Sequence, residues 1–175
     1  MKISKEITVF ALAAGLLALF LYRRKKQDVA KISGRDQNYG HTSSNGGSGT
    51  RGQRNNNPFN IRYNSANTWK GQTGSDGAFC VFDTMQHGIR AGGVLLRNYI
   101  KAGNNTIRKI ISKFAPSNEN DTESYIKHVA QMSGTGENEK LTAADLWKIA
   151  VPMMRIESGY TATSADRQYF DNPNL

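Results

Sequence analysis

Apolar residues follow two different patterns along this chain of 175 residues. In the C-terminal half they recur at spacings of three and four, in blocks separated by glycine, asparagine or proline. Threonine or aspartate opens each block, where its side chain can cap the first helical turn. The blocks predict helices at about residues 84–102, 106–114, 121–133 and 142–159.

The first helical block follows a segment of a different type. Asn55–Gly77 is rich in Asn and Gly and predicts loops, and the run Gly77–Phe82 predicts a short β segment. Pro152 lies inside the last block and is expected to kink or divide that helix. Residues 53–175 are therefore expected to form a mainly α-helical domain with a small β-hairpin.

The second apolar pattern is the uncharged run Ile7–Tyr22, which Arg23–Lys26 follows directly. Sixteen residues at helical rise span about 24 Å, and flanking Lys and Tyr side chains can extend the reach to a bilayer of roughly 30 Å. The run predicts one transmembrane helix, with the lipid bilayer as its partner. The alternative is a cleaved signal peptide, which the four basic residues directly after the run disfavour.

Between these two patterns lies a stretch of low apolar content. Residues 27–52 are rich in Gly, Ser and Asn and show no helical spacing, which is typical of a flexible linker. The predicted organisation is therefore an N-terminal membrane anchor with a basic flank at 1–26, a linker at 27–52 and a globular domain at 53–175.

The net charge of +9 is concentrated at the N-terminus. Residues 1–57 hold 10 Lys/Arg and 3 Asp/Glu, whereas residues 58–175 hold 13 and 11. A basic arm beside an apolar run is typical of contact with anionic lipid, and a nucleic-acid-binding domain would carry its charge on the folded body. The single cysteine, Cys80, lies in an apolar run and is expected to be buried. No pattern indicates a metal or another cofactor.

Two separated segments resemble parts of one enzyme family. The motifs Asn56–Arg62 (NNPFNIR), Trp69-Lys70-Gly71 and Phe79–Phe82 resemble, in order, the later motifs of bacterial glucosaminidases of the flagellar-assembly and autolysin type. Residues 154–160 (MRIESGY) resemble the catalytic motif that comes first in those enzymes, and also the Glu-Ser motif of lytic transglycosylases. The order is that of a circularly permuted, lysozyme-like domain that cleaves peptidoglycan.

The first motif is also similar to an Asn-Asn-Asn-Pro-Gly-Asn-Ile-Arg signature of phage virion proteins, including those of tailless phages with an internal membrane. Phe59 stands where that signature has glycine, and phenylalanine disfavours the positive φ that glycine allows. The resemblance implies a single-pass protein of the internal virion membrane, with peptidoglycan glycan strands and other virion proteins as partners.

Cleavage of the glycan needs an acid that protonates the leaving oxygen, and the resemblance assigns this role to Glu157. A glutamate at the C-terminal end of an apolar helix is expected to have a raised pKa because burial and the helix dipole both favour the neutral form. No clear second carboxylate emerges. Asp76, Asp83 and Asp145 are candidates, but turns and helix caps account for all three.

The sequence also offers polar and aromatic groups that could bind sugar. Hydrogen-bonding and stacking side chains of the two segments form the candidate substrate-binding set, with Tyr99 and Tyr125 as further aromatic residues that could reach the cleft. The set consists of Asn57, Asn60, Arg62, Trp69, Gln72 and Tyr160.

Three functions remain open from the sequence. The first is a membrane-anchored virion enzyme that cleaves the glycan strand during entry as a lytic transglycosylase, or as a glycosidase of the muramidase or glucosaminidase type. The second is a non-catalytic structural protein of the virion membrane that binds the cell wall through a lysozyme-like module. The third, a protein that tethers nucleic acid through Arg23–Arg35, is the least favoured.

Overall fold

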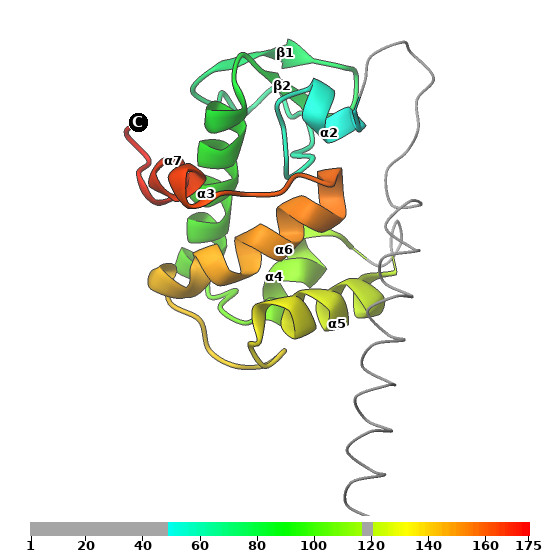
Figure 1. The fold of residues 1–175 in the computed structure, drawn as a ribbon, viewed down its shortest axis with the longest axis vertical. Helices are drawn as coiled ribbons and strands as arrows, with labels where there is room; N and C mark the ends of the chain where they lie inside the picture. Colours follow the sequence, from blue (N-terminus) through cyan, green and yellow to red (C-terminus); the bar gives the residue numbers. More distant parts are fainter. Residues whose placement is uncertain (1–48, 117–120) are drawn as a thin grey trace, which may run out of the picture. The chain divides into compact units, whose positions relative to one another are not determined.

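The computed structural model describes residues 49–116 and 121–175. Four of the helices in these residues have eight or more residues and enclose most of the core, and a two-stranded hairpin lies at the end of the domain where α6 ends (Figure 1). These elements are β1 (Gln72–Ser75), β2 (Cys80–Phe82), α3 (Met85–Lys101), α4 (Ile107–Phe114), α5 (Thr122–Ser133) and α6 (Leu146–Ser158). The shorter helices are α2 (Arg51–Arg54), η1 (Ala143–Asp145), η2 (Ser164–Asp166) and α7 (Arg167–Asp171).

The helices α3, α4 and α5 begin and end within one residue of the bounds that the sequence indicates, whereas α6 begins at Leu146, four residues after the predicted 142. Thr84, Thr106 and Asp121 precede α3, α4 and α5, and each side chain accepts a hydrogen bond from a backbone N–H in the first turn. Gly134 and Gly159 end α5 and α6 with φ of 69° and 66°. Glycine adopts this left-handed conformation without a Cβ penalty, so both helices stop there.

The core is a single cluster of buried apolar side chains, most of them from the four long helices, β2 and the loop before β1, with Phe170 from α7. Phe59 and Phe170 are both completely buried and stack with ring centroids 6.4 Å apart. Trp147 packs against the edge of Phe170 at 5.2 Å. These aromatic contacts join the loop at residues 56–62, α6 and α7 into one packed unit.

Two glycines of α3 allow the loop at residues 56–62 to lie directly on that helix. A Cβ at Gly88 would clash with the backbone carbonyl of Asn56, and a Cβ at Gly92 would clash with the ring of Phe59. The positive φ values of the loop fall on Asn56 (50°) and Asn60 (46°). Asparagine tolerates this region better than most residues, so phenylalanine fits at position 59 without strain.

The C-terminal segment beyond α6 returns to pack on α3, as Figure 1 shows for α7. Arg97 donates to the carbonyl of Phe170 at 2.7 Å, and Arg90 donates to that of Pro173. Lys70 donates to the carbonyl of Asn174 at 3.1 Å. This segment has no helical apolar repeat, and the sequence did not predict α7.

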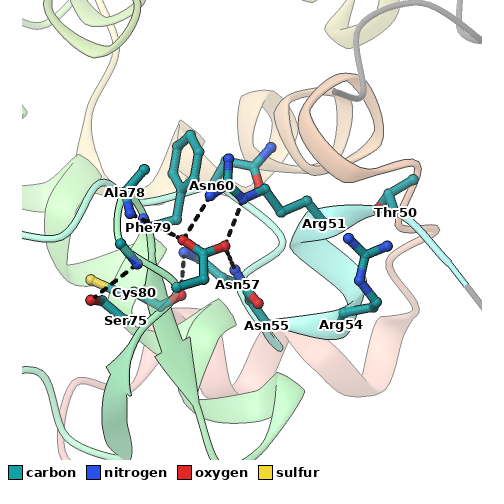
Figure 2. A network of polar contacts seen from close by, with 12 residues as sticks. Thr50, Arg51, Arg54, Asn55, Asn57, Asn60, Ser75, Ala78, Phe79 and Cys80 are labelled. Atoms are coloured by element: carbon teal, nitrogen blue, oxygen red, sulfur yellow. Dashed lines mark hydrogen bonds and ion pairs between the residues drawn. The ribbon is translucent and has the colours of Figure 1, made fainter. Parts of the chain in front are cut away.

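The hairpin is antiparallel and is tied to α2 by one carboxylate. Asp76, in the turn between β1 and β2, accepts hydrogen bonds from Arg51 Nε at 2.6 Å and Asn55 Nδ2 at 2.6 Å. It also accepts from the backbone N–H groups of Ala78 and Phe79. Figure 2 shows Arg51 and Asn55 directed toward this turn. Burial opposes ionisation, but these hydrogen bonds outweigh it and hold the pKa of Asp76 well below its usual range.

The structure differs from the sequence-based expectations in the fold class, at Pro152 and at the end of the predicted linker. No helix in the described part of the chain is long and apolar enough to cross a membrane, so the fold class is corrected to a mainly helical domain with a two-stranded hairpin. The predicted transmembrane helix at Ile7–Tyr22 lies outside the described residues. Pro152 does not divide α6, and α2 begins at Arg51, just inside the predicted linker.

Candidate functional site

A cleft of about 790 Å³ opens where the loop after Asn60, the hairpin and the end of α6 meet. Its walls combine aromatic rings with amide, hydroxyl and charged groups, the mixture that sugar-binding sites use. Of the predicted site residues, Asn60, Arg62, Trp69 and Glu157 line it. The other lining residues are Ile61, Tyr63, Asn64, Ser65, Asn67, Phe79, Leu95, Tyr99, Lys113, Phe114, Ala115 and Pro116.

Glu157 lies at the C-terminal end of α6 and is held by residues from distant segments. Asn60 donates through Nδ2 to the backbone carbonyl of Glu157 at 2.6 Å and to its carboxylate Oε2 at 3.3 Å. Tyr125, a buried residue of α5, also hydrogen-bonds the carboxyl group. The positive φ of Asn60 turns its side chain toward the helix end, so the loop geometry and the placement of the acid depend on each other.

Ser158, the residue after the acid, fixes the end of α6 to the loop. Its hydroxyl lies 3.0 Å from the carbonyl of Pro58 and 2.9 Å from that of Met154, and its own carbonyl accepts from Thr50 at 2.6 Å. A Cβ at Gly52 would lie only 2.6 Å from that of Ser158. The serine of the Glu-Ser pair is therefore a buried structural residue that sets the position of Glu157.

The environment of Glu157 favours the neutral acid. Burial raises its pKa to about 7, although the hydrogen bonds from Tyr125 and Asn60 and the positive charge of Arg62 act in the opposite direction. The residue is only half-buried, so a molecule in the cleft can reach it. At neutral pH a large fraction of Glu157 holds a proton that it can donate, as a general acid requires.

The raised pKa has a consequence for stability that does not depend on any activity. Because the folded state binds the proton more tightly than the unfolded state, stability falls as pH rises from about 4.5 to about 7. Glu157→Gln removes this loss, so the variant should gain on the order of 2 kcal/mol relative to wild type between pH 5 and pH 8. Urea unfolding at both pH values measures the change.

Glu123→Gln is the matched control for this measurement. Hydrogen bonds from Arg108 lower the pKa of the exposed Glu123, a shift opposite in direction to that of Glu157, so Glu123→Gln lacks the gain in stability that Glu157→Gln should show as pH rises. The difference between Glu123→Gln and wild type should stay constant from pH 5 to pH 8. A constant difference for Glu157→Gln as well would contradict a raised pKa at the acid.

Asn57 was predicted to bind substrate, but the structure gives it another role. The residue is completely buried, and its Nδ2 donates to the carbonyls of Ile61 at 3.0 Å and Cys80 at 2.9 Å. Its Oδ1 accepts from the N–H of Ile61 at 2.8 Å. These bonds hold the loop against β2, and no part of Asn57 lines the cleft.

Gln72 and Tyr160 also lie outside the cleft lining. Gln72 accepts from the backbone N–H of Trp69 at 3.3 Å and so shapes the loop behind that ring. The hydroxyl of Tyr160 donates to Asp166 at 3.1 Å, and burial together with this carboxylate raises the pKa of Tyr160 to about 12. Both side chains support neighbouring backbone, so the predicted sugar-binding set is reduced to Asn60, Arg62 and Trp69.

None of the three candidate second carboxylates lines the cleft in the described part of the chain. Asp76 ties the hairpin to α2, as described above. Asp83 pairs with His87 at 2.6 Å, and Asp145 closes the capping box of Thr142. Each carboxylate is engaged in structure, so the described residues supply Glu157 as the only carboxylate of the cleft wall.

The sequence missed part of the cleft. Of the two further aromatic residues that the sequence offered, Tyr99 lines the cleft, whereas Tyr125 is 3% exposed and contacts the acid from the core. Lys113 and Phe114 come from the end of α4, where nothing in the local sequence marks a site. A charged residue followed by an aromatic residue at a helix end is a weak signal that only the tertiary structure makes meaningful.

Comparison with known proteins places the chain among bacteriophage proteins. No family model matches it. Over 114 residues, which cover 62% of this chain and 71% of the relative, it is 42% identical to Protein P5 of Pseudoalteromonas phage PM2. The chain belongs to the Protein P5 family. The expected bacteriophage origin of the family is thus confirmed, whereas the name Protein P5 states no activity, and membership of the lysozyme-like superfamily stays a prediction.

Proposed function

We propose that this member of the Protein P5 family is a component of a phage particle whose helical domain cleaves the glycan strand of peptidoglycan. The observation that carries the proposal is one carboxyl group, Glu157, with a pKa raised to about 7 on the wall of an open cleft. Trp69, Tyr63 and Tyr99 offer faces for sugar rings beside it, and Asn60 and Arg62 offer hydrogen bonds.

The chemistry requires no group beyond the substrate and the acid. Glu157 donates its proton to the glycosidic oxygen, and the bond from that oxygen to C1 of the sugar breaks. The 6-hydroxyl of the same sugar attacks C1, and its proton passes to the carboxylate of Glu157, which is then ready for the next strand. The products are a strand with a 1,6-anhydro end and a strand with a new free hydroxyl.

A transglycosylase is favoured over a hydrolase by the composition of the cleft wall. Hydrolases use a second carboxylate to activate water or to stabilise the sugar cation. Among the described residues, Glu157 is the only carboxylate in the lining. Tyr125 and Arg62 can stabilise the carboxylate that forms when the proton leaves, because both favour the ionised form.

The second candidate is a structural protein of the virion that binds cell-wall glycan without turnover. Its support is the relationship to Protein P5 of a phage, since membership of this family points to a role in the particle and carries no statement of catalysis. The same cleft would then serve as a binding groove. The two candidates differ only in whether the proton of Glu157 is used.

Product analysis separates the candidates. Purified full-length protein is incubated with peptidoglycan sacculi, and released fragments are analysed by mass spectrometry. Cleavage with 1,6-anhydro ends is the expected result. Reducing ends would keep the enzyme but replace the transglycosylase mechanism by hydrolysis. Binding to sacculi without released fragments would favour the structural candidate.

A further inference from the structure

The short helix α2 lies against the end of the helix that carries the acid. Figure 1 shows α2 beside the C-terminal end of α6. The composition of residues 27–52 predicts a linker, yet Thr50 and Gly52 both pack on α6. Neither residue lines the cleft, so any effect that they have on the chemistry must pass through other groups.

Thr50 supplies a hydrogen bond to the last turn of α6. Its Oγ1 donates to the backbone carbonyl of Ser158 at 2.6 Å. The last carbonyls of a helix have no partner inside the helix, so a side-chain donor at this point fixes where the helix ends in space. Because Ser158 directly follows Glu157, the bond restrains the backbone of the acid.

Gly52 lies where the loop and the end of α6 come closest to α2. A Cβ on Gly52 would lie 2.6 Å from the Cβ of Ser158, 2.8 Å from Oδ1 of Asn60 and 2.9 Å from the carbonyl of Asn57. At these distances the neighbouring atoms would have to move. The φ of Gly52 is not in the left-handed region, so glycine is needed for the space it leaves and not for its backbone freedom.

The amide group of Asn60 fills this space in one fixed orientation. The carbonyl of Glu157 can only accept a hydrogen bond, so the Asn60 atom at 2.6 Å from it is Nδ2. The amide oxygen Oδ1 then faces Gly52, where it is buried and has no hydrogen-bond partner among the described residues. Such an acceptor is unfavourable. Turning the amide would remove both donations to Glu157, so the unfavourable orientation is the one that holds the acid.

We propose that Thr50 and Gly52 are positioning residues of the acid. They act through Ser158 and Asn60, by fixing the end of α6 and the orientation of the amide. The effect on turnover rests on the proposed function, whereas the effect on the acid itself does not depend on any activity. The part of the chain needed for function then begins before residue 53, inside the predicted linker.

Gly52→Ala in the full-length protein tests the inference. The added methyl group must displace the amide of Asn60 or the end of α6, and a displacement of about 1 Å can cost about 10²-fold in rate. We expect kcat on soluble glycan strands to fall by about 10-fold or more, and KM to change by less than about twofold because the substitution lies outside the cleft lining.

The titration of Glu157 gives a second readout that needs no turnover. The hydrogen bond from Asn60 acts to lower the pKa of Glu157, so its loss in Gly52→Ala should move this pKa further above about 7. Carbon NMR of the glutamate carboxyl groups measures the pKa, and the signal that is missing in Glu157→Gln identifies the acid. A loss of stability alone would leave the pKa in the folded protein unchanged.

Gly74→Ala is the matched control, because a Cβ on this glycine of β1 would have no other atom within 4 Å. It should leave kcat, KM and the pKa of Glu157 at their wild-type values. Thr50→Val and Thr50→Ser give an independent test that holds even where Gly52→Ala does not fold. Serine keeps the hydroxyl that donates to Ser158 and valine removes it, so only Thr50→Val should lower kcat and raise the pKa of Glu157.

The outcomes separate this inference from the proposed function. A pKa of Glu157 that stays the same or falls in the folded Gly52→Ala and Thr50→Val variants would overturn the inference. Equal effects of Thr50→Val and Thr50→Ser would also overturn it. A raised pKa in the variants of a protein whose wild type does not cleave glycan would support the positioning role and overturn only the catalytic proposal.

Discussion

Glu157→Gln should reduce the cleavage of peptidoglycan by about 10²–10⁴-fold, the range typical of a lost general acid. Glutamine keeps the size of the side chain and can still accept the hydrogen bond from Asn60, which measures 3.3 Å in the wild type. Its amide group is far too weak an acid to protonate the glycosidic oxygen. Release of soluble fragments from sacculi, followed over time at pH 6–7, measures the loss.

Thermal melting of the same variant checks that the substitution leaves the fold intact. Glu157→Gln should melt at or above the wild-type temperature near neutral pH, because the substitution removes a carboxyl group whose ionisation is disfavoured by burial. Glu123→Gln, on the exposed side of α5, should keep full activity. Full activity in Glu157→Gln would remove the acid from the proposed mechanism and leave the structural candidate in its place.

Asn57→Ala should lower the free energy of unfolding by about 3–4 kcal/mol. The substitution leaves the N–H of Ile61 without the acceptor that Asn57 supplies and removes one donor each from the carbonyls of Ile61 and Cys80, although the Ile61 carbonyl keeps the hydrogen bond from the N–H of Cys80. Each buried polar group without a hydrogen bond costs roughly 1–3 kcal/mol, and partial relaxation of the loop limits the sum. Urea unfolding of the full-length protein measures the change.

Asn64→Ala is the matched control for this variant. Asn64 belongs to the same loop region, is exposed, and accepts one hydrogen bond from the N–H of Ala66 at 2.9 Å. Its loss should change stability by about 0.5 kcal/mol or less. If Asn57→Ala kept wild-type stability but weakened glycan binding, the residue would return to the substrate-binding set from which its burial removes it.

The helical part of the fold could be predicted because its signals are local. Threonine and aspartate caps, glycine stops and apolar spacing place both ends of α3, α4 and α5 and the end of α6 within one residue of the observed bounds, whereas α6 begins four residues after the predicted 142 because η1 occupies Ala143–Asp145. The helix α7 could not be predicted, since five residues hold little more than one turn. Its position depends on Phe170 entering the core, which only the tertiary packing determines.

Part of the candidate site could be predicted from the sequence, because residue type identifies polar side chains but does not tell what each of them contacts. Asn60, Arg62, Trp69 and Glu157 do line one cleft although the segments are distant in the chain. Polar residue type alone, however, does not tell a ligand contact from a loop support. Asn57 and Asn60 are three residues apart in one motif, yet the first faces the backbone of β2 and the second faces the acid.

The hydrogen bond from Asn60 to Glu157 joins residues 97 positions apart in the chain. A ribosome-bound chain has therefore already exposed the motif Asn56–Arg62 and both strands of the hairpin before the acid is synthesised. The cleft contains its acid only when α6 is complete. The stacking of Phe59 on Phe170 can form only after residue 170 has been synthesised. Premature termination anywhere before residue 157 would thus release fragments that contain no acid and cannot assemble the site.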